Sequence, residues 1–214
     1  MSIQKERLKG LARKVRCLRH PYLIKRAMLL PLEKVRTKTQ RTMAGEYSKY
    51  SMSLQSWLAD VERTRNVDAF RVFEELSPEF LRHVERCLRQ VGDVGGPITL
   101  DLGRLLYATV RLKLPDVVVE TGVANGLSSA CILEGLHRNR RGTLYSIDLH
   151  CREGLFVPPE KDLGWMIPAE LRYRWSLVLG ESTKVLPVLL NRLRNIDLFL
   201  HDSCHTYKTM LFEY

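Results

Sequence analysis

The sequence lacks the features that would place the protein in a membrane or in a secretory pathway. Its 214 residues contain no apolar run of about 18 residues, the length that a membrane-spanning helix needs. No apolar stretch with a small-residue cleavage site follows the basic N-terminus, so this end does not resemble a secretory signal. The five cysteines are scattered and form no C-x-x-C pair, which suits a reducing compartment better than a disulfide framework. These absences predict a cytoplasmic protein.

The body of the chain also lacks a net charge of either sign. The whole sequence carries +10, but residues 1–45 alone hold 13 Lys and Arg against two Glu. The remaining residues hold 21 basic and 22 acidic side chains, so the basicity belongs to one end. A basic surface on the folded body would be needed for a nucleic-acid-binding enzyme. No specific nucleic-acid partner is therefore expected.

The basic end contains a helical pattern within residues 1–31. Apolar residues recur at three- and four-residue steps from Leu8 to Leu18, with Lys and Arg around them, and Pro21 stops the pattern. Such a helix can lie on an anionic membrane surface or on an acidic partner. The commoner alternative is a solvated helix packed on its own domain or on a second subunit of a homo-oligomer. Weak peripheral membrane contact through residues 1–31 and homo-oligomerisation both stay open.

The sequence divides into three predicted segments. Residues 1–52 form the basic tail and a polar linker, residues 53–96 form a helical segment, and residues 97–214 form the main domain. The helical segment is best marked in "SPEFLRHVERCLRQVG". There, Ser77 is placed to cap a helix and Gly92 to follow its end.

Short apolar runs alternate with helical patterns from Asp116 onward. Strands are predicted in "DVVVET", "TLYSIDLH", "WSLVLG" and "IDLFLHD", with helices in "SSACILEGLHRNRRG" and "STKVLPVLLNRLRN" between them. Continuous apolar strands that alternate with helices are typical of a parallel sheet covered on both faces. The predicted fold class is therefore α/β, a Rossmann-like parallel sheet of about four strands with an α-helical, basic N-terminal extension.

Polar residues and glycines follow each of the four predicted strands. Ligands of open parallel sheets bind outside the carboxyl ends of the strands, so these positions are the informative ones. A purely structural sheet would not need such residues at every strand end. They are Glu120, Gly122 and Gly126 after the first strand; Asp148 and His150 after the second; Gly180, Glu181 and Ser182 after the third; and His201, Asp202, His205 and Tyr207 after the fourth.

Each of these residues has an ordinary structural alternative when it is taken alone. Gly122 and Gly126 either form a tight turn or clear space for a ligand. Asp148 is either a helix cap or surface acid, or it accepts hydrogen bonds from both hydroxyls of a ribose. Glu181 also suits a helix N-terminus through the helix dipole, and His205 is as readily a packed or solvated histidine as a functional one. A glycine turn after one strand and an acid after the next together indicate a nucleoside-containing cofactor.

The dinucleotide fingerprint G-x-G-x-x-G is absent, and a different motif stands in its place. Four segments occur in order: "VVVETGVANGLSS", "GTLYSIDLH", "LVLGESTKVLPVLL" and "IDLFLHDSCHTYKTMLFEY". In this order and spacing they resemble class I S-adenosylmethionine-dependent methyltransferases. The resemblance is to a subgroup that often methylates hydroxyls of sugars or natural products, and it covers about residues 97–214.

This resemblance implies a role for each strand-end residue. The cofactor would be S-adenosyl-L-methionine. Asp202 and His205 would be catalytic, Asp202 as general base or metal ligand and His205 as base or orienting group. The cofactor-binding residues would be Glu120 at the methionine amino group, Gly122 and Gly126 around the methionine part, Asp148 at the ribose, and Glu181 and Ser182 beside the adenine.

The resemblance also implies what the protein acts on. We expect O-methylation of a hydroxyl on a sugar-containing or natural-product small molecule. Cys204 stands where related proteins often carry an acid, so a divalent metal such as Mg²⁺ has weak support and no metal ligand is assigned. The fold normally continues beyond the fourth strand, whereas this sequence stops at Tyr214; the alternative is a truncated or inactive cofactor-binding protein. Residues 151–168 are either a lid over the cofactor or a plain surface loop.

Overall fold

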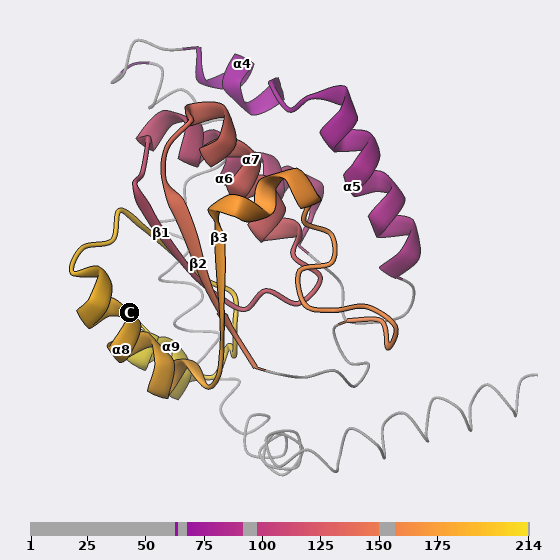
Figure 1. Cartoon of the computed structure of the whole chain (residues 1–214). Helices are drawn as coiled ribbons and strands as arrows, with labels where there is room; N and C mark the ends of the chain where they lie inside the picture. The colour runs from indigo at the N-terminus through magenta and orange to yellow at the C-terminus, as the bar shows by residue number, and fades with distance from the viewer. Residues whose placement is uncertain (1–62, 64–67, 92–97, 150–156, 214) are drawn as a thin grey trace, which may run out of the picture.

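The computed structural model describes residues 63, 68–91, 98–149 and 157–213 (Figure 1). The basic tail, with the helix predicted in residues 1–31, lies outside this part of the chain, as does His150. The three segment boundaries therefore stay a prediction. Within the described residues, no helix is both long and apolar enough to cross a membrane.

Four strands form one sheet in which every neighbouring pair is parallel. The order across the sheet is β3-β2-β1-β4, so β1 lies between β2 and β4. The predicted α/β class and its four strands are confirmed. The strands are β1 (Val117–Thr121), β2 (Thr143–Asp148), β3 (Trp175–Leu179) and β4 (Leu198–His201).

Helices cover the two faces of this sheet (Figure 1). On one face α6 packs on α7, and α5 lies outside them; on the other face α8 and α9 lie side by side. This layering is that of a Rossmann-like fold. The helices are α4 (Ala69–Glu74), α5 (Pro78–Val91), α6 (Leu100–Lys113), α7 (Leu127–Asn139), the 3₁₀ helix η1 (Ala169–Arg174), α8 (Ser182–Leu193) and α9 (Tyr207–Glu213).

Successive side chains of β1 point to opposite faces of the sheet and pack into two separate cores. Val118 packs with Leu133 and other α7 residues on one face, while Val119 packs with Leu186 and Leu189 of α8 on the other. Because both faces are covered, the strands must be apolar on both sides, which explains their continuous apolar runs.

Two helix ends carry information for the site. Ser77 caps α5 as predicted, since its hydroxyl oxygen accepts a bond of 3.2 Å from the Phe80 amide. In α8, the N-cap position is held by Glu181, and Ser182 is the first helical residue. The hydroxyl of Ser182 is instead hydrogen-bonded to Glu213 of α9. Ser182 therefore bonds a buried carboxylate that is distant in sequence, and the local sequence could not predict this contact.

Candidate functional site

The β1–α7 loop is packed against backbone on two sides. Gly122 and Gly126 have φ of +89° and +88°, a region that favours glycine. A Cβ on Gly122 would lie 2.2 Å from the carbonyl oxygen of Asp202, and one on Gly126 would lie 2.6 Å from the Cα of Gly164. At both glycines, the missing Cβ makes room for the chain's own backbone. Contact of these glycines with a methionine moiety stays a prediction.

Asp148 joins the end of β2 to the same loop. Its Oδ2 accepts hydrogen bonds from the amides of Val123 (2.7 Å) and Ala124 (2.9 Å), and its Oδ1 accepts one from Leu149 (2.6 Å). A carboxylate has about four acceptor positions, so about one is left, on Oδ1. The side chain thus caps a loop, and it retains capacity to accept a hydroxyl donor.

Glu120 lies in the interior, beneath the N-terminus of α7. The residue has no exposed surface, and three hydroxyls donate to its carboxylate: Ser128 (2.5 Å), Ser129 (2.6 Å) and Ser146 (2.8 Å). Burial raises the pKa of Glu120 to about 7, although the three hydrogen bonds oppose this shift. The predicted contact with a methionine amino group is not tested by this arrangement and stays a prediction.

The described part of the 151–168 loop lies against the β1–α7 loop. Its backbone amides at Gly164 and Met166 donate to the carbonyls of Ala124 (2.9 Å) and Asn125 (3.0 Å). The indole of Trp165 donates to the Asn125 side chain at 2.7 Å. Since Asn125 is buried, these contacts cover the turn that carries the two glycines. Between a lid and a plain surface loop, this packing favours a cover.

The end of β3 supplies the more exposed edge of the site. The amide of Gly180 donates to the carbonyl of Asp148 at 2.8 Å, which ties the β3–α8 turn to the end of β2. Glu181 is half-exposed and pairs with Lys184 at 2.8 Å. Ser182 points instead toward Glu213. Contact of Glu181 and Ser182 with an adenine stays a prediction.

The end of β4 brings the two predicted catalytic residues together. Nε2 of His205 lies 3.5 Å from Oδ1 of Asp202, and both side chains are partly exposed. Burial raises the pKa of Asp202, while the neighbouring His205 and His201 act in the opposite direction. The amide of Asp202 donates to the carbonyl of Thr121 at 2.8 Å, so this pair sits directly beside the end of β1.

Sequence reasoning missed a buried cluster behind this pair. The carboxylate of Glu213 contacts Thr121 at the end of β1, and His201 and Ser203 at the end of β4. His201 stands among the strand-end residues without an assigned role. Glu213 carries no signal in the sequence because its partners lie up to 92 residues away. Only the fold brings these residues to one place.

Nothing in the described residues assigns a metal. No group of three or more His, Cys, Asp and Glu side chains in ranges 68–91, 98–149 and 157–213 has the arrangement of a metal site. Sγ of Cys204 lies 3.8 Å from the hydroxyl of Thr206.

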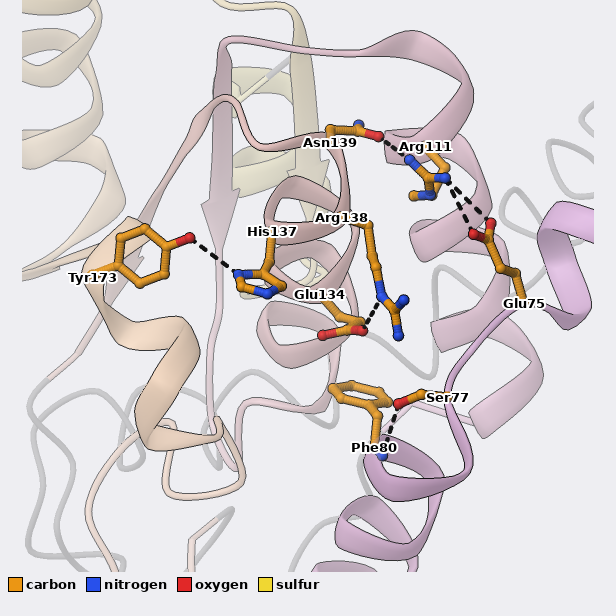
Figure 2. Close-up of polar contacts among 9 residues, drawn as sticks. All are labelled: Glu75, Ser77, Phe80, Arg111, Glu134, His137, Arg138, Asn139 and Tyr173. Atoms are coloured by element: carbon orange, nitrogen blue, oxygen red, sulfur yellow. Dashed lines mark hydrogen bonds and ion pairs between the residues drawn. The ribbon is translucent and has the colours of Figure 1, made fainter.

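A separate hollow of about 600 Å³ lies between α5, α7 and η1. Figure 2 shows three of the residues that line it, Glu134, His137 and Arg138. Nε of Arg138 donates to a carboxylate oxygen of Glu134 at 2.9 Å. Nδ1 of His137 lies 3.1 Å from the hydroxyl of the neighbouring Tyr173. Its lining mixes both charges, with Arg86, Arg138 and Arg140 against Glu79, Glu134 and Glu170. None of the predicted site residues lines it.

A comparison with protein families finds one match in the C-terminal part of the chain. Residues 119–214 match the family described as "Methyltransferase domain". These residues, a little under half of the chain, are therefore similar to a methyltransferase domain. The matched residues contain the carboxyl ends of all four strands, and the parallel sheet is of the Rossmann-like class that the motifs predict. Dependence on S-adenosylmethionine stays a prediction. A comparison with curated proteins gives no match.

Several solved structures are similar to this chain. The methyltransferase PaMTH1 of Podospora anserina, crystallised with SAH, shares 19% identity over 66% of this chain and 58% of its own, with a TM-score of 0.45. The O-methyltransferase TomG of Streptomyces achromogenes, in complex with SAM, shares 19% identity over 72% and 63%, with a TM-score of 0.44. An O-methyltransferase of Bacillus cereus, in complex with SAH, shares 14% identity over 60% and 56%, with a TM-score of 0.42. The chain thus spans less than two thirds of their length.

Substituting Gly122 tests the packing of the β1–α7 loop. We expect Gly122→Ala to lower the free energy of unfolding by about 1–3 kcal/mol or more. The added methyl group would overlap the carbonyl oxygen of Asp202, and alanine would have to adopt the positive φ of Gly122. Urea denaturation measures the change. Ala124→Gly, in the same loop at φ +45°, is the control and should change stability by less than about 1 kcal/mol. A Gly122→Ala protein as stable as the wild type would contradict the packing described.

The buried Glu120 predicts an unusual dependence of stability on pH. The folded state binds this proton more tightly than the unfolded state, since its pKa is about 7 against an ordinary 4.5. The stabilisation is therefore complete below about pH 4.5 and is lost as the pH rises through about 7. Between pH 5 and 8 the wild type should lose roughly 2.5 kcal/mol more of its free energy of unfolding than Glu120→Gln. Urea titrations at each pH measure this, with the exposed Glu170→Gln as control. Parallel curves for wild type and Glu120→Gln would refute the shift.

Proposed function

We propose that the protein transfers a methyl group from S-adenosylmethionine to a hydroxyl of a small molecule, of the sugar-containing or natural-product class. The observation that carries this proposal is the convergence of four strand ends on one edge of a parallel sheet, within residues that match a methyltransferase domain. Glycines, two acids and an acid–histidine pair meet there, each from a different strand or loop.

The residues at this edge fit the proposed cofactor. Asp148 keeps an acceptor position on Oδ1 beside the glycine loop, which suits a ribose hydroxyl. Glu120 would act from beneath, by fixing Ser128 and Ser129 at the start of α7. The cofactor supplies a methyl group already activated on a sulfonium, so the protein mainly has to align the acceptor oxygen and remove its proton.

Asp202 and His205 are suited to the proton-transfer part of this task. Both are partly exposed, and they lie 3.5 Å apart at the end of β4. A carboxylate whose pKa is raised by burial is a better match to a general base near neutral pH. His205 beside it can orient the carboxylate or take the proton itself. The alternative, a cofactor-binding protein without turnover, shares the binding half of this account and differs only in the transfer step.

Calorimetry with SAH tests the cofactor half of the proposal. The wild type should bind SAH, and Asp148→Ala should bind at least tenfold more weakly, as the loss of about 1.5–3 kcal/mol from a charged hydrogen bond implies. Asp197→Ala is a matched control. Oδ2 of Asp197 also accepts two backbone amides, from Asp116 and Val117, but at the amino edge of the sheet. No binding by the wild type, or equal weakening by both variants, would contradict the assignment.

Labelled S-adenosylmethionine tests the transfer half. The wild type, incubated with a panel of small hydroxylated acceptors such as sugars and phenols, should move the labelled methyl group to at least one of them. Asp202→Asn should lower the rate by about 10²–10⁴-fold while SAH still binds, because it removes the proposed base. SAH binding without transfer to any acceptor would favour the alternative function.

A further inference from the structure

The last helix of the chain is attached through a buried carboxylate. Among the seven residues of α9, all of them described, only Glu213 is buried, and its side chain has no exposed surface. Apolar residues of the same helix lie outward, with Leu211 67% and Phe212 43% exposed. The helix is therefore positioned by a polar contact rather than by an apolar core.

This carboxylate is saturated with donors from the carboxyl edge of the sheet. Oε2 lies 2.5 Å from the Thr121 hydroxyl and 2.6 Å from Nδ1 of His201, and Oε1 lies 3.0 Å from the Ser203 hydroxyl. Burial alone would raise the pKa of Glu213, but hydrogen bonds from these groups and from Ser182 outweigh it, so the pKa is lowered. A buried carboxylate is stable only with such partners.

His201 links this buried group to the surface of the site. Its side chain is 2% exposed, and its ring meets the ring of His205 edge-on, with centroids 5.2 Å apart and planes at 83°. His205 is 62% exposed and pairs with Asp202. A continuous series of contacts thus runs from Glu213 through His201 to the pair that faces the acceptor in the proposed function.

We propose that Glu213 is a positioning residue for this reaction: its bond to Nδ1 of His201 fixes the ring against which the Asp202–His205 pair is oriented. This inference rests on the proposed function. A carboxylate on Nδ1 sets both the tautomer and the orientation of an imidazole. Glu213 itself is enclosed and does not reach a ligand; it acts through His201.

The geometry separates this role from simple anchoring of α9. The bonds from Ser203 and from His201 fall on different oxygens of the carboxylate, Oε1 and Oε2. Ser203→Ala therefore removes an anchor without touching the His201 contact. Glu213→Gln keeps the shape of the side chain and removes its charge from the His201 bond.

Proton NMR of ¹⁵N-histidine-labelled protein provides a readout that needs no acceptor. The wild type should show a strongly downfield, slowly exchanging imidazole N–H proton, which His201→Gln assigns by removing it. Glu213→Gln should move this signal upfield and shift the His205 ring resonances, while Ser203→Ala should leave the signal in place. SAH affinity should change less than about threefold in Glu213→Gln, and its methyl-transfer rate should fall at least tenfold, because positioning acts on the proton-transfer step.

The outcomes are distinct. A wild type without the downfield proton overturns the inference, whether or not the variants fold. So does a folded Glu213→Gln protein with the wild-type signal and transfer rate. Equal shifts in Glu213→Gln and Ser203→Ala would mean that the carboxylate only anchors α9. If the wild type shows the downfield proton but neither binds SAH nor transfers methyl, the proposed function is refuted. The His201–Glu213 bond then exists, but the positioning role proposed for it is refuted as well.

Discussion

The β1–α7 loop is enclosed by backbone on more than one side, and the rest of the site depends on this packing. The carbonyl of Asp202 fills the space beside Gly122, and the backbone of Gly164 fills the space beside Gly126. Asp148 holds the amides of Val123 and Ala124 from the end of β2. Three separate segments contact this one short loop. A substitution that moves any of them will therefore change the position of the loop at the carboxyl edge of the sheet.

Two buried carboxylates organise the two sides of that edge. Glu120 accepts hydrogen bonds from serine hydroxyls on the α7 face of the sheet. Glu213 is hydrogen-bonded to a histidine and to a serine hydroxyl on the α8–α9 face. Their pKa values move in opposite directions: burial dominates for Glu120, which has only hydroxyl donors, whereas the hydrogen bonds, one from a histidine, dominate for Glu213. The partly exposed pair of Asp202 and His205 lies beside the second of these carboxylates, so its orientation follows from buried polar contacts.

The sequence predicted the sheet well because its strands are short β-branched runs bounded by polar residues. The residues at the strand ends could be selected for the same reason, since a parallel sheet brings them to one edge. Their contacts could not be predicted. Ser182 has the local pattern of a helix cap, yet its hydroxyl goes to Glu213. Glu213 and Thr121 are 92 residues apart in sequence, and no local pattern joins them.

The central claim is that the carboxyl edge of this sheet binds the cofactor of a methyltransferase. A crystal structure of the protein with SAH tests it most directly. The account predicts the ligand beside the ends of β1 and β2, with the ribose on Asp148 and Asp202 near the sulfur. A ligand bound elsewhere, for example in the hollow between α5, α7 and η1, would contradict it.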